Sequence, residues 1–302
     1  MNHDRSWRWQ RKSAPYLFLS PFALLFLVFM AYPLGRSLVL SFFKTAGPRD
    51  MRYIGLGNYR FLLGDRVFWG AVLNTAVFTA AFITVQVPAS LGLAMLLNSP
   101  RLRGRSFFRF AFFSSYLVGP VFVAILFGML LDERHGMVNL LLRRIGLISE
   151  PVGFLTNPEL AMLSTLMAAL WLSVGFGMIY FLAALQGVDR QLYEAAEVDG
   201  AGRWSRFRHV TLPGIRPVLV FMVLVGTIAG FQLFELPYVL FQGAGPGARG
   251  LTIVMYLFIW GFGAGDLGYA AAIGWMLVAI ILVVALAQVK GMRIAKEGSA
   301  RG

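Results

Sequence analysis

The chain contains no cysteine among its 302 residues. This absence excludes disulfide bonds, thiolate catalysis and metal sites built from cysteine. Charge is also scarce, because only 14% of the residues are charged whereas 58% are hydrophobic. Acidic residues are fewer than basic ones: the chain has 14 Asp and Glu and 27 Lys and Arg, which gives a net charge of +13. This composition is typical of a membrane protein.

The sequence also lacks the motifs of nucleotide and metal chemistry. It has no G-x-x-x-x-G-K-[ST] stretch, so the chain itself has no P-loop for the phosphates of ATP. Gly263, Gly265 and Gly268 spell G-x-G-x-x-G, but an apolar run follows where a dinucleotide-binding unit needs an acidic residue. The three histidines are dispersed along the chain. We therefore expect no cofactor, no metal site and no enzymatic activity.

Long runs without charge are what the sequence does contain. Five such runs exceed the roughly 20 residues that a helix needs to cross a bilayer, and they cover 13–35, 67–100, 110–131, 160–188 and 267–289; a sixth apolar run, 217–240, holds a single acid, Glu235. A further apolar piece, 251–265, is too short to cross and is expected to be an interfacial or re-entrant segment on the outer side. The expected fold is therefore all-α, a polytopic membrane protein with six transmembrane helices.

The distribution of positive charge predicts the orientation. Seventeen Lys and Arg lie in the two terminal segments and in the loops around 101–109 and 190–216, whereas the other loops hold nine. The positive-inside rule then places both termini in the cytoplasm, which requires an even number of spans. The predicted organisation is a cytoplasmic tail at 1–14, the first transmembrane helix and outer loop at 15–66, a five-helix core at 67–289 with a cytoplasmic loop at 189–216, and a cytoplasmic tail at 290–302.

One polar stretch, EAAEVDGAGRWSRFRHVTLP at 194–213, interrupts the apolar runs. Asp189 is a suitable N-cap for a helix over 190–199, and Gly200 can end that helix in the left-handed conformation. A second short helix is predicted over 203–210, stopped by Leu212-Pro213. Such a stretch is often an amphipathic helix that rests on lipid headgroups. The acidic face with Glu194 and the small alanines favour docking into a groove of another protein.

These residues resemble the EAA signature of the permease subunits of binding-protein-dependent ABC importers. The positions that carry the resemblance are Glu194, Ala195, Ala196, Gly200, Val210, Leu212 and Pro213, with Val210 where the family usually has isoleucine. YLFLSPFALLFLVFMAYPLGRSLVLSFF, GLGNYRFLL, NTAVFT, FELPYVL and GYAAAIG resemble the carbohydrate and glycerol-phosphate branch, first-permease type. FQGAGPGARGLT, at 241–252, departs from the Thr-x-Gly-Gly-Pro pattern of that branch, in a loop expected to face the binding protein.

The resemblance implies the type I ABC importer permease fold in the cytoplasmic (inner) membrane of a prokaryote. It implies that the chain forms half of a pathway for a sugar, polyol or glycerol phosphate delivered by an extracytoplasmic substrate-binding protein. The partners that it implies are a second permease subunit and two ATPase subunits. On this resemblance Glu194 contacts the ATPase, Ala195 and Ala196 permit close approach, and Gly200 fixes the turn.

Polar and aromatic side chains within the apolar runs are candidates for the substrate pathway: Asn74, Gln86, Trp171, Tyr180, Gln232 and Glu235. Each also has a structural interpretation, because polar side chains hold transmembrane helices together. Glu235 either faces the pathway or pairs with a basic residue at the outer interface. The G-x-x-x-G spacing of Gly226 and Gly230 predicts close packing, within the chain or against the partner permease.

Two other classes of protein were weighed. A secondary transporter or channel for a small polar solute would need several buried acids or paired broken helices, and only Glu235 fits that description. A membrane-embedded enzyme would need titratable groups that converge near the bilayer, and the sequence shows no such group. Of the two, the secondary transporter or channel is the main alternative.

Overall fold

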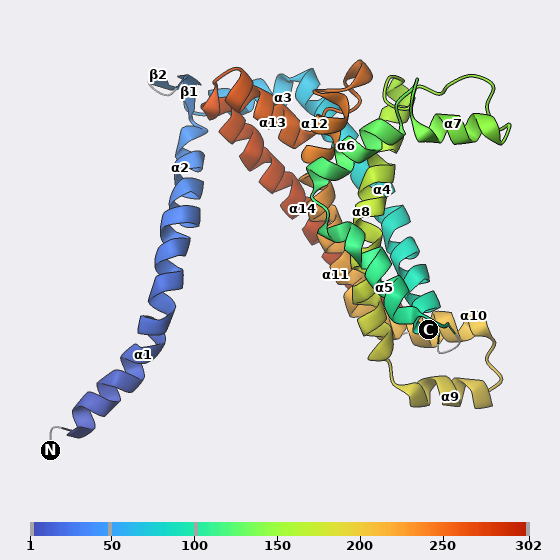
Figure 1. The fold of residues 1–302 in the computed structure, drawn as a ribbon. Helices are drawn as coiled ribbons and strands as arrows, with labels where there is room; N and C mark the ends of the chain where they lie inside the picture. Colours follow the sequence, from blue (N-terminus) through green and yellow to red (C-terminus); the bar gives the residue numbers. More distant parts are fainter. Residues whose placement is uncertain (1–2, 48–49, 100–101, 300–302) are drawn as a thin grey trace. The chain divides into compact units, whose positions relative to one another are not determined.

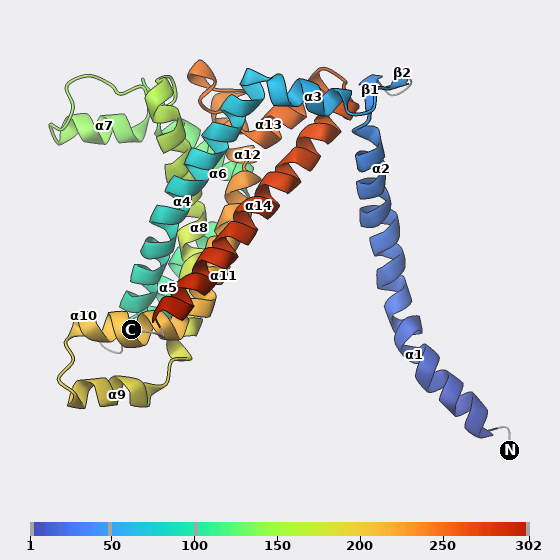
Figure 2. The same ribbon diagram turned by 180° about the vertical axis from the view of Figure 1, so that it is seen from behind.

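The computed structural model describes residues 3–47, 50–99 and 102–299, with side chains between 14 and 291. Arg101 lies outside the described residues. The charged side chains of the two predicted tails before residue 14 and after residue 291, Arg301 among them, also lie outside the described residues. The chain divides into two compact units, Met1–Asp65 with Leu257–Met276, and Arg66–Tyr256 with Leu277–Gly302. Figures 1 and 2 show the elements of both units from opposite sides.

The first unit opens with a long apolar helical segment. Its elements are α1 (His3–Phe26), the π-helical η1 (Leu27–Ala31), α2 (Tyr32–Leu40), β1 (Phe43–Ala46), β2 (Asp50–Tyr53), α3 (Gly57–Gly64), η5 (Ile259–Gly263) and the start of α14 (Leu267–Ser299). The two strands form an antiparallel hairpin in which Phe43 pairs with Tyr53 and Ala46 with Asp50. The helical segment Ala14–Leu40 is long and apolar enough to cross a membrane, as the first predicted span required.

A network of hydrogen bonds joins the hairpin to the start of α14 within this unit. One carboxylate oxygen of Asp266 accepts from the backbone N–H of Thr45 (3.3 Å), from the Thr45 hydroxyl (3.2 Å) and from the N–H of Tyr269 (3.0 Å). A side chain at Gly268 would collide with the carbonyl oxygen of Phe43. The G-x-G-x-x-G run therefore serves this close turn, since Gly268 leaves room for the strand.

The second unit holds a bundle of long helices. Its elements are α4 (Arg66–Asn98), α5 (Arg105–Ser114), the 3₁₀ turn η2 (Ser115–Leu117), α6 (Pro120–Leu130), α7 (Met137–Arg144), α8 (Pro158–Gln186), α9 (Arg190–Val198), α10 (Arg203–Arg206), the π-helical η3 (Phe207–Thr211), α11 (Leu212–Phe231), α12 (Glu235–Phe241), the 3₁₀ turn η4 (Pro246–Ala248), most of α13 (Ile253–Phe258) and the end of α14. Helices α4, α8 and α11 pack against one another. In this unit α7 and α12 lie at one end of the long helices, and α9 and α10 lie at the other (Figure 1).

Small residues bring α11 close to α4. A Cβ atom added to Gly230 would lie 2.5 Å from the hydroxyl oxygen of Thr79, and one added to Gly226 would lie 3.4 Å from Ile83. Of the two packing partners predicted for the G-x-x-x-G spacing, the structure shows the one within the chain. Glycine allows this approach because the helix backbone itself forms the contact surface.

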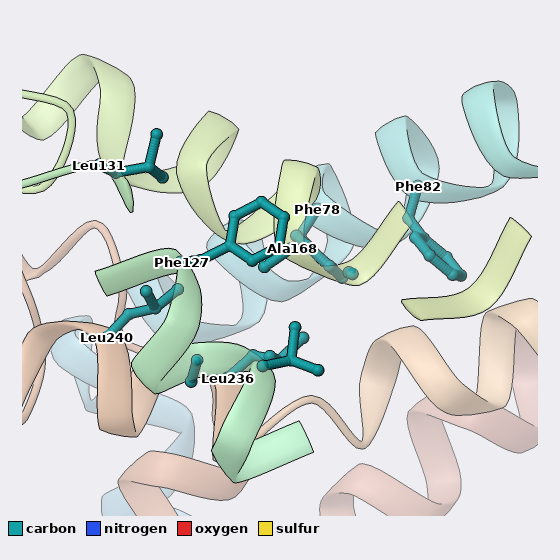
Figure 3. Packing of buried hydrophobic residues seen from close by; sticks show 10 residues of the cluster. Phe78, Phe82, Phe127, Leu131, Ala168, Leu236 and Leu240 are labelled. Carbon is teal, nitrogen blue, oxygen red and sulfur yellow. The ribbon is translucent and has the colours of Figure 1, made fainter. Parts of the chain in front are cut away.

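A buried apolar cluster fills the end of the second unit near α6 and α12 (Figure 3). Phe78 and Phe82 of α4 stack with their ring centroids 5.8 Å apart and are 1% and 7% exposed. Phe127 of α6 and Leu236 of α12 belong to the same cluster. The cluster thus fixes α6 and the short helix α12 against the long helices, which positions the residues between α11 and α12.

Five described helices are long and apolar enough to cross a membrane, and the number rises to six if one bent pair counts as a single span. That pair is Arg105–Leu117 with Pro120–Leu130, which meet at 99°. The third predicted span, 110–131, is therefore divided between two helices that meet at a sharp bend. Val118 and Gly119 are extended, because the residue before a proline avoids the helical region and Pro120 starts a new helix. The short apolar piece 251–265 forms helical turns over Ile253–Gly263, below spanning length as predicted.

The fifth predicted span, 217–240, is also divided. Helix α11 ends at Phe231, and α12 begins again at Glu235 after an irregular turn. This break places Pro237 in the first turn of α12, where its missing N–H leaves no helical hydrogen bond unmade. Glu235 was predicted to lie buried in an apolar run, but it is exposed at the start of a separate short helix.

Candidate coupling loop and pathway cavity

The polar loop begins with α9, which is capped at both ends. The carboxylate of Asp189 accepts a hydrogen bond from the N–H of Gln191 (2.9 Å), as an N-cap residue does. Gly200 follows the helix with φ +74°, in the left-handed region. The N–H groups of Gly200 and Ala201 donate to carbonyl oxygens of α9 at 3.1 and 2.8 Å. This Schellman motif confirms the prediction that Gly200 ends the helix.

The second helix of the loop continues farther than predicted. Leu212-Pro213 was expected to stop it, but α10, η3 and α11 form one helix over Arg203–Phe231. The π turn η3 lies directly before Pro213, which occupies the first turn of α11. A wider π turn absorbs the clash that a proline ring makes with the carbonyl one turn earlier. The loop is therefore directly continuous with the fifth apolar helix.

Two side-chain contacts join α9 to this continuous helix. Arg206 Nη1 donates to Glu197 Oε2 at 3.1 Å, and the side chains are 27% and 71% exposed. The hydroxyls of Tyr193 and Thr211 lie 3.0 Å apart within hydrogen-bonding distance. With the capped turn at Gly200, these contacts make the loop a small folded unit, so that a force on α9 reaches the next helix.

The surface of the loop that faces away from the helix bundle is not covered by any other described part of the chain. Glu194 is 68% exposed, and its Oε1 lies 3.8 Å from Nε of Arg190 one turn earlier. Val198 is 88% exposed and Trp204 is 71% exposed, although both are large and apolar. Ala195 lies on the exposed side of α9. A surface with one carboxylate, small residues and bare apolar side chains is suited to contact with another protein.

The inner side of the loop is packed on the second unit. Leu212 and Phe207 pack against a buried cluster of α4, α8 and α11. A Cβ atom at Gly214 would lie 2.8 Å from the side chain of Val188, so that only glycine fits there. The remaining predicted coupling residues are intermediate in burial at Ala196 and Val210 and exposed at Pro213.

A cavity of about 230 Å³ lies between α4, η2, α6, α8 and α11 and the start of α12. Its polar lining consists of Tyr116, Ser173, Gln232 and Glu235, and its other lining residues are apolar or glycine. Two of the predicted pathway residues, Gln232 and Glu235, therefore come together. They meet because α11 ends at Phe231 and the following turn carries both to the same cavity.

Two other predicted pathway residues are engaged within the helix bundle. The Asn74 amide donates to the carbonyl oxygens of Ala248 (2.9 Å) and Leu251 (3.1 Å), so it holds the segment between α12 and α13. Gln86 is 3% exposed and donates to the Ser90 hydroxyl at 3.2 Å. Its amide oxygen has no hydrogen-bond partner among the described residues. Neither side chain lines the cavity that holds Gln232 and Glu235.

The two predicted aromatic residues lie elsewhere on α8. Trp171 is 43% exposed and lines a separate cavity of about 470 Å³ with Ser114 and Ser115. Its ring centroid is 6.1 Å from that of Phe127. Tyr180 is 37% exposed and lies one turn below Phe176, with 4.8 Å between the ring centroids.

The segment around α7 holds a carboxyl group whose pKa is shifted, Asp132. Hydrogen bonds from the backbone N–H groups of His135 (2.7 Å) and Arg134 (3.0 Å) lower the pKa of Asp132 from its usual 3.8, since they favour the charged carboxylate. Asn139, which is 3% exposed, holds the same turn to the backbone of Val152 (2.9 Å). Within the described part of the chain no three His, Asp or Glu side chains gather as a metal site.

Comparison with known proteins identifies the family. The family described as "Binding-protein-dependent transport system inner membrane component" matches residues 86–290, which include the loop at 189–216 and most of the residues that line the cavity. The chain belongs to this family. It is therefore an inner-membrane permease subunit of an importer that depends on a binding protein, and the subunit has no catalytic role.

Individual permeases of the family align over most of the chain. The arabinooligosaccharides transport system permease protein AraP of Bacillus subtilis is 38% identical over 288 residues, covering 94% of this chain and 91% of that protein. The lactose transport system permease protein LacF of Rhizobium radiobacter is 37% identical, with coverage of 90% and 92%. A permease chain in the crystal structure of a bacterial ABC transporter for the acidic polysaccharide alginate has a TM-score of 0.82 at 27% identity, covering 96% and 98%.

Several residues that shape the permease site were missed by the sequence argument. Glu197 and Arg206 are nine positions apart, and their pairing could have been expected once Gly200 was known to reverse the chain. Gly214 carries no recognisable signal, because its need for space arises from Val188, which is distant in sequence. Tyr116 was missed because the break before Pro120 was not foreseen.

Proposed function

We propose that this permease forms half of the pathway for a neutral sugar, driven by a separate ATPase that docks on the loop at 189–216. The observation that carries the proposal is the likeness over nine-tenths of the chain to permeases named for arabinooligosaccharides and for lactose. A solved relative is seen with a periplasmic protein bound to an alginate pentasaccharide. All three substrates are carbohydrates, and the binding protein delivers such a substrate from outside.

The chemistry of the cavity favours an uncharged saccharide over glycerol phosphate or a uronate. Gln232, Tyr116 and Ser173 offer hydrogen-bond donors and acceptors, as sugar hydroxyls require. Glu235 is the charged residue of the lining, and among the described residues no Lys or Arg lines this cavity. A carboxylate without a basic neighbour repels a phosphate or a uronate, whereas it accepts hydrogen bonds from hydroxyls.

The size of the cavity fits a pathway shared with a second permease. At about 230 Å³ it is smaller than the roughly 300–1,000 Å³ of pockets that enclose a drug-sized ligand. All of its lining residues belong to the second unit of this chain. A partner permease would supply the opposite wall, and the two chains together would enclose a sugar.

The orientation of the permease in the membrane follows from the positions of basic residues at the two ends of the second unit. The α4–α5 and α8–α11 connections lie at one end of the second unit, and the segments around α7 and α12 lie at the other (Figure 1). The first end carries Arg103, Arg105, Arg190, Arg203 and Arg208, so the positive-inside rule assigns it to the cytoplasm. Glu194, Ala195, Ala196 and Gly200 then face the ATPase, and the same rule applied to the basic terminal segments of the sequence places both chain termini in the cytoplasm.

Reconstitution of the whole importer tests the proposal. The permease is placed in liposomes with its second permease, the ATPase and the binding protein, and uptake of radiolabelled lactose, arabinotriose, maltotriose and glycerol 3-phosphate is measured. We expect uptake of a neutral saccharide that requires both ATP and the binding protein. Uptake restricted to glycerol 3-phosphate would overturn the choice of substrate. Uptake driven by an ion gradient without ATP would favour a secondary transporter instead.

A further inference from the structure

Four aromatic rings form a continuous series on the second unit. Tyr116 of η2 stacks on Phe176 of α8 with 4.4 Å between the ring centroids. Phe176 lies 4.8 Å from Tyr180, and Tyr180 lies 5.5 Å from Phe221 of α11. Three elements that are far apart in sequence thus contribute to one row of rings, here called the aromatic track: Tyr116, Phe176, Tyr180 and Phe221.

The aromatic track begins at the cavity and leads away from it. Tyr116 is itself part of the cavity lining, together with Ser173 of α8 and Gly230 of α11. Tyr180 follows Ser173 by seven residues, which is about 10 Å along the helix, in the direction of the coupling loop. Phe221 precedes Gly230 by nine residues, or about 13 Å, and so lies at a similar depth.

The exposure of the track differs from that of rings that only fill a core. Tyr116, Tyr180 and Phe221 are 45%, 37% and 44% exposed, whereas the core rings Phe78 and Phe82 are 1% and 7% exposed. The rings touch one another in stacked and tilted pairs, and part of each of these three rings is left uncovered. This uncovered part, the open side of the track, is available to a ligand in a way that the core rings are not.

The tyrosine hydroxyls argue against a lipid-facing row. Within the described part of the chain, neither the Tyr116 nor the Tyr180 hydroxyl has a hydrogen-bond partner. A hydroxyl facing hydrocarbon without a partner costs free energy, because lipid tails offer neither donors nor acceptors. Both hydroxyls are satisfied if the open side of the track faces water or a polar ligand.

We propose that the aromatic track is a second saccharide-binding site, along which a sugar leaves the cavity toward the cytoplasmic end of the permease. This rests on the proposed function, since it assumes that the cavity holds a sugar. A sugar ring presents apolar C–H groups on its faces and hydroxyls at its rim, so it stacks on an aromatic ring while its hydroxyls remain hydrated. Rings about 5 Å apart offer a series of similar weak sites, and release requires that no single site binds tightly.

The aromatic track also predicts selectivity. The face of an aromatic ring carries negative partial charge, so it repels anions and accepts the slightly positive C–H groups of a sugar. The carboxylate of Glu235 in the cavity also repels anions, so both places disfavour an anionic substrate. A neutral saccharide therefore meets a favourable surface at both places, and a phosphorylated or acidic one does not.

Uptake by variants of the whole reconstituted importer tests the aromatic track. Tyr180→Leu and Phe221→Leu keep an apolar side chain but remove the ring, and we expect each to lower the maximal rate of sugar uptake about two- to tenfold. Tyr180→Phe and Phe221→Tyr keep the ring and should retain most of the rate. Phe107→Leu is the matched control, because Phe107 is 68% exposed and paired with Phe108 outside the track.

The outcomes separate this proposal from the proposed function. If the unaltered importer carries none of the neutral saccharides, the proposed function fails before the variants are compared. If it carries one of them and both leucine variants do so at the unaltered rate, the aromatic track is refuted while the proposed function stands. A loss of uptake in the leucine variants but not in the Phe107 control supports the track.

Cysteine labelling gives a second measurement that does not depend on transport rates. The chain has no cysteine, so Tyr180→Cys and Phe221→Cys each introduce a single reactive thiol. We expect a water-soluble methanethiosulfonate reagent to label both positions, and the transported sugar to slow the labelling. Labelling only by a lipid-soluble maleimide would show that the rings face the bilayer, and that result would overturn the proposal.

Discussion

Reversing the charge of Glu194 is the sharpest test of the coupling loop, because the structure separates its effect on the chain from its effect on a partner. Glu194 pairs with Arg190 at 3.8 Å, and the two side chains are 68% and 93% exposed. An exposed pair one helical turn apart contributes about 0.3–0.5 kcal/mol, and an arginine at 194 adds a repulsion of similar size. The total cost to α9 is therefore about 1 kcal/mol.

The cost at a docked interface is much larger than this. Placing a like or unpaired charge in a contact between two proteins costs about 2–5 kcal/mol, which weakens docking about 30-fold or more. The Glu194→Arg variant is therefore expected to insert and to assemble with the second permease normally. It should lose most of its ATP-dependent sugar uptake, because closure of the ATPase no longer moves the permease.

The assay compares uptake and ATP hydrolysis in the same proteoliposomes. Insertion is checked by the amount of permease and by its thermal unfolding midpoint, which should change little. Glu150→Arg is the matched control, since Glu150 is an exposed acid in the segment around α7 and outside the coupling loop. If Glu194→Arg carries sugar as fast as the control does, Glu194 does not contact the ATPase and the coupling argument is wrong.

Three further predictions concern the packing of α11 on α4, the contact between α9 and α10, and the turn at Asp132. Gly230→Ala places a methyl group 2.5 Å from a threonine oxygen of α4 and should lower the free energy of unfolding by about 1–3 kcal/mol in detergent, whereas Gly92→Ala, with nothing within 4 Å, should not. Reversing both charges of the Glu197–Arg206 pair should restore most of the uptake lost in either single reversal, and an additive loss in the double variant would refute the link between α9 and α10. Because the pKa of Asp132 is lowered, its charged carboxylate should stabilise the turn fully above pH 3.8, and this stabilisation should be lost as the pH falls through the lowered pKa. A carboxyl-carbon NMR titration of Asp132 with a midpoint at or above 3.8 would contradict this.

The helices that follow from periodicity and charge were predictable, and their interruptions were less so. A long apolar run predicts a span because any helix in lipid must satisfy its own backbone, whatever its neighbours are. The break before Pro120 was visible in the sequence, since a proline excludes the helical conformation from the residue before it. The break after Phe231 was less visible, because Pro237 lies several residues beyond the end of α11.

The coupling loop was more predictable than the cavity for a physical reason. Asp189 and Gly200 act through their own backbone neighbours, so their roles can be read locally. Asn74 and Gln232 are both polar residues in apolar surroundings, yet one holds a backbone segment and the other lines the cavity. Whether a polar side chain holds a backbone segment or lines a cavity depends on how the helices pack, and a single sequence does not contain that information.

The absence of any joint between the loop and the fifth apolar helix has a mechanical consequence. From Arg203 to Phe231 the chain is one rod of 29 residues, or about 43 Å at 1.5 Å per residue. Tilting such a rod by about 5° about the end that carries the loop displaces the other end by about 4 Å. Gly230, which lines the cavity, lies at that far end, so under the proposed function a swing of the loop and a widening of the cavity would be a single movement.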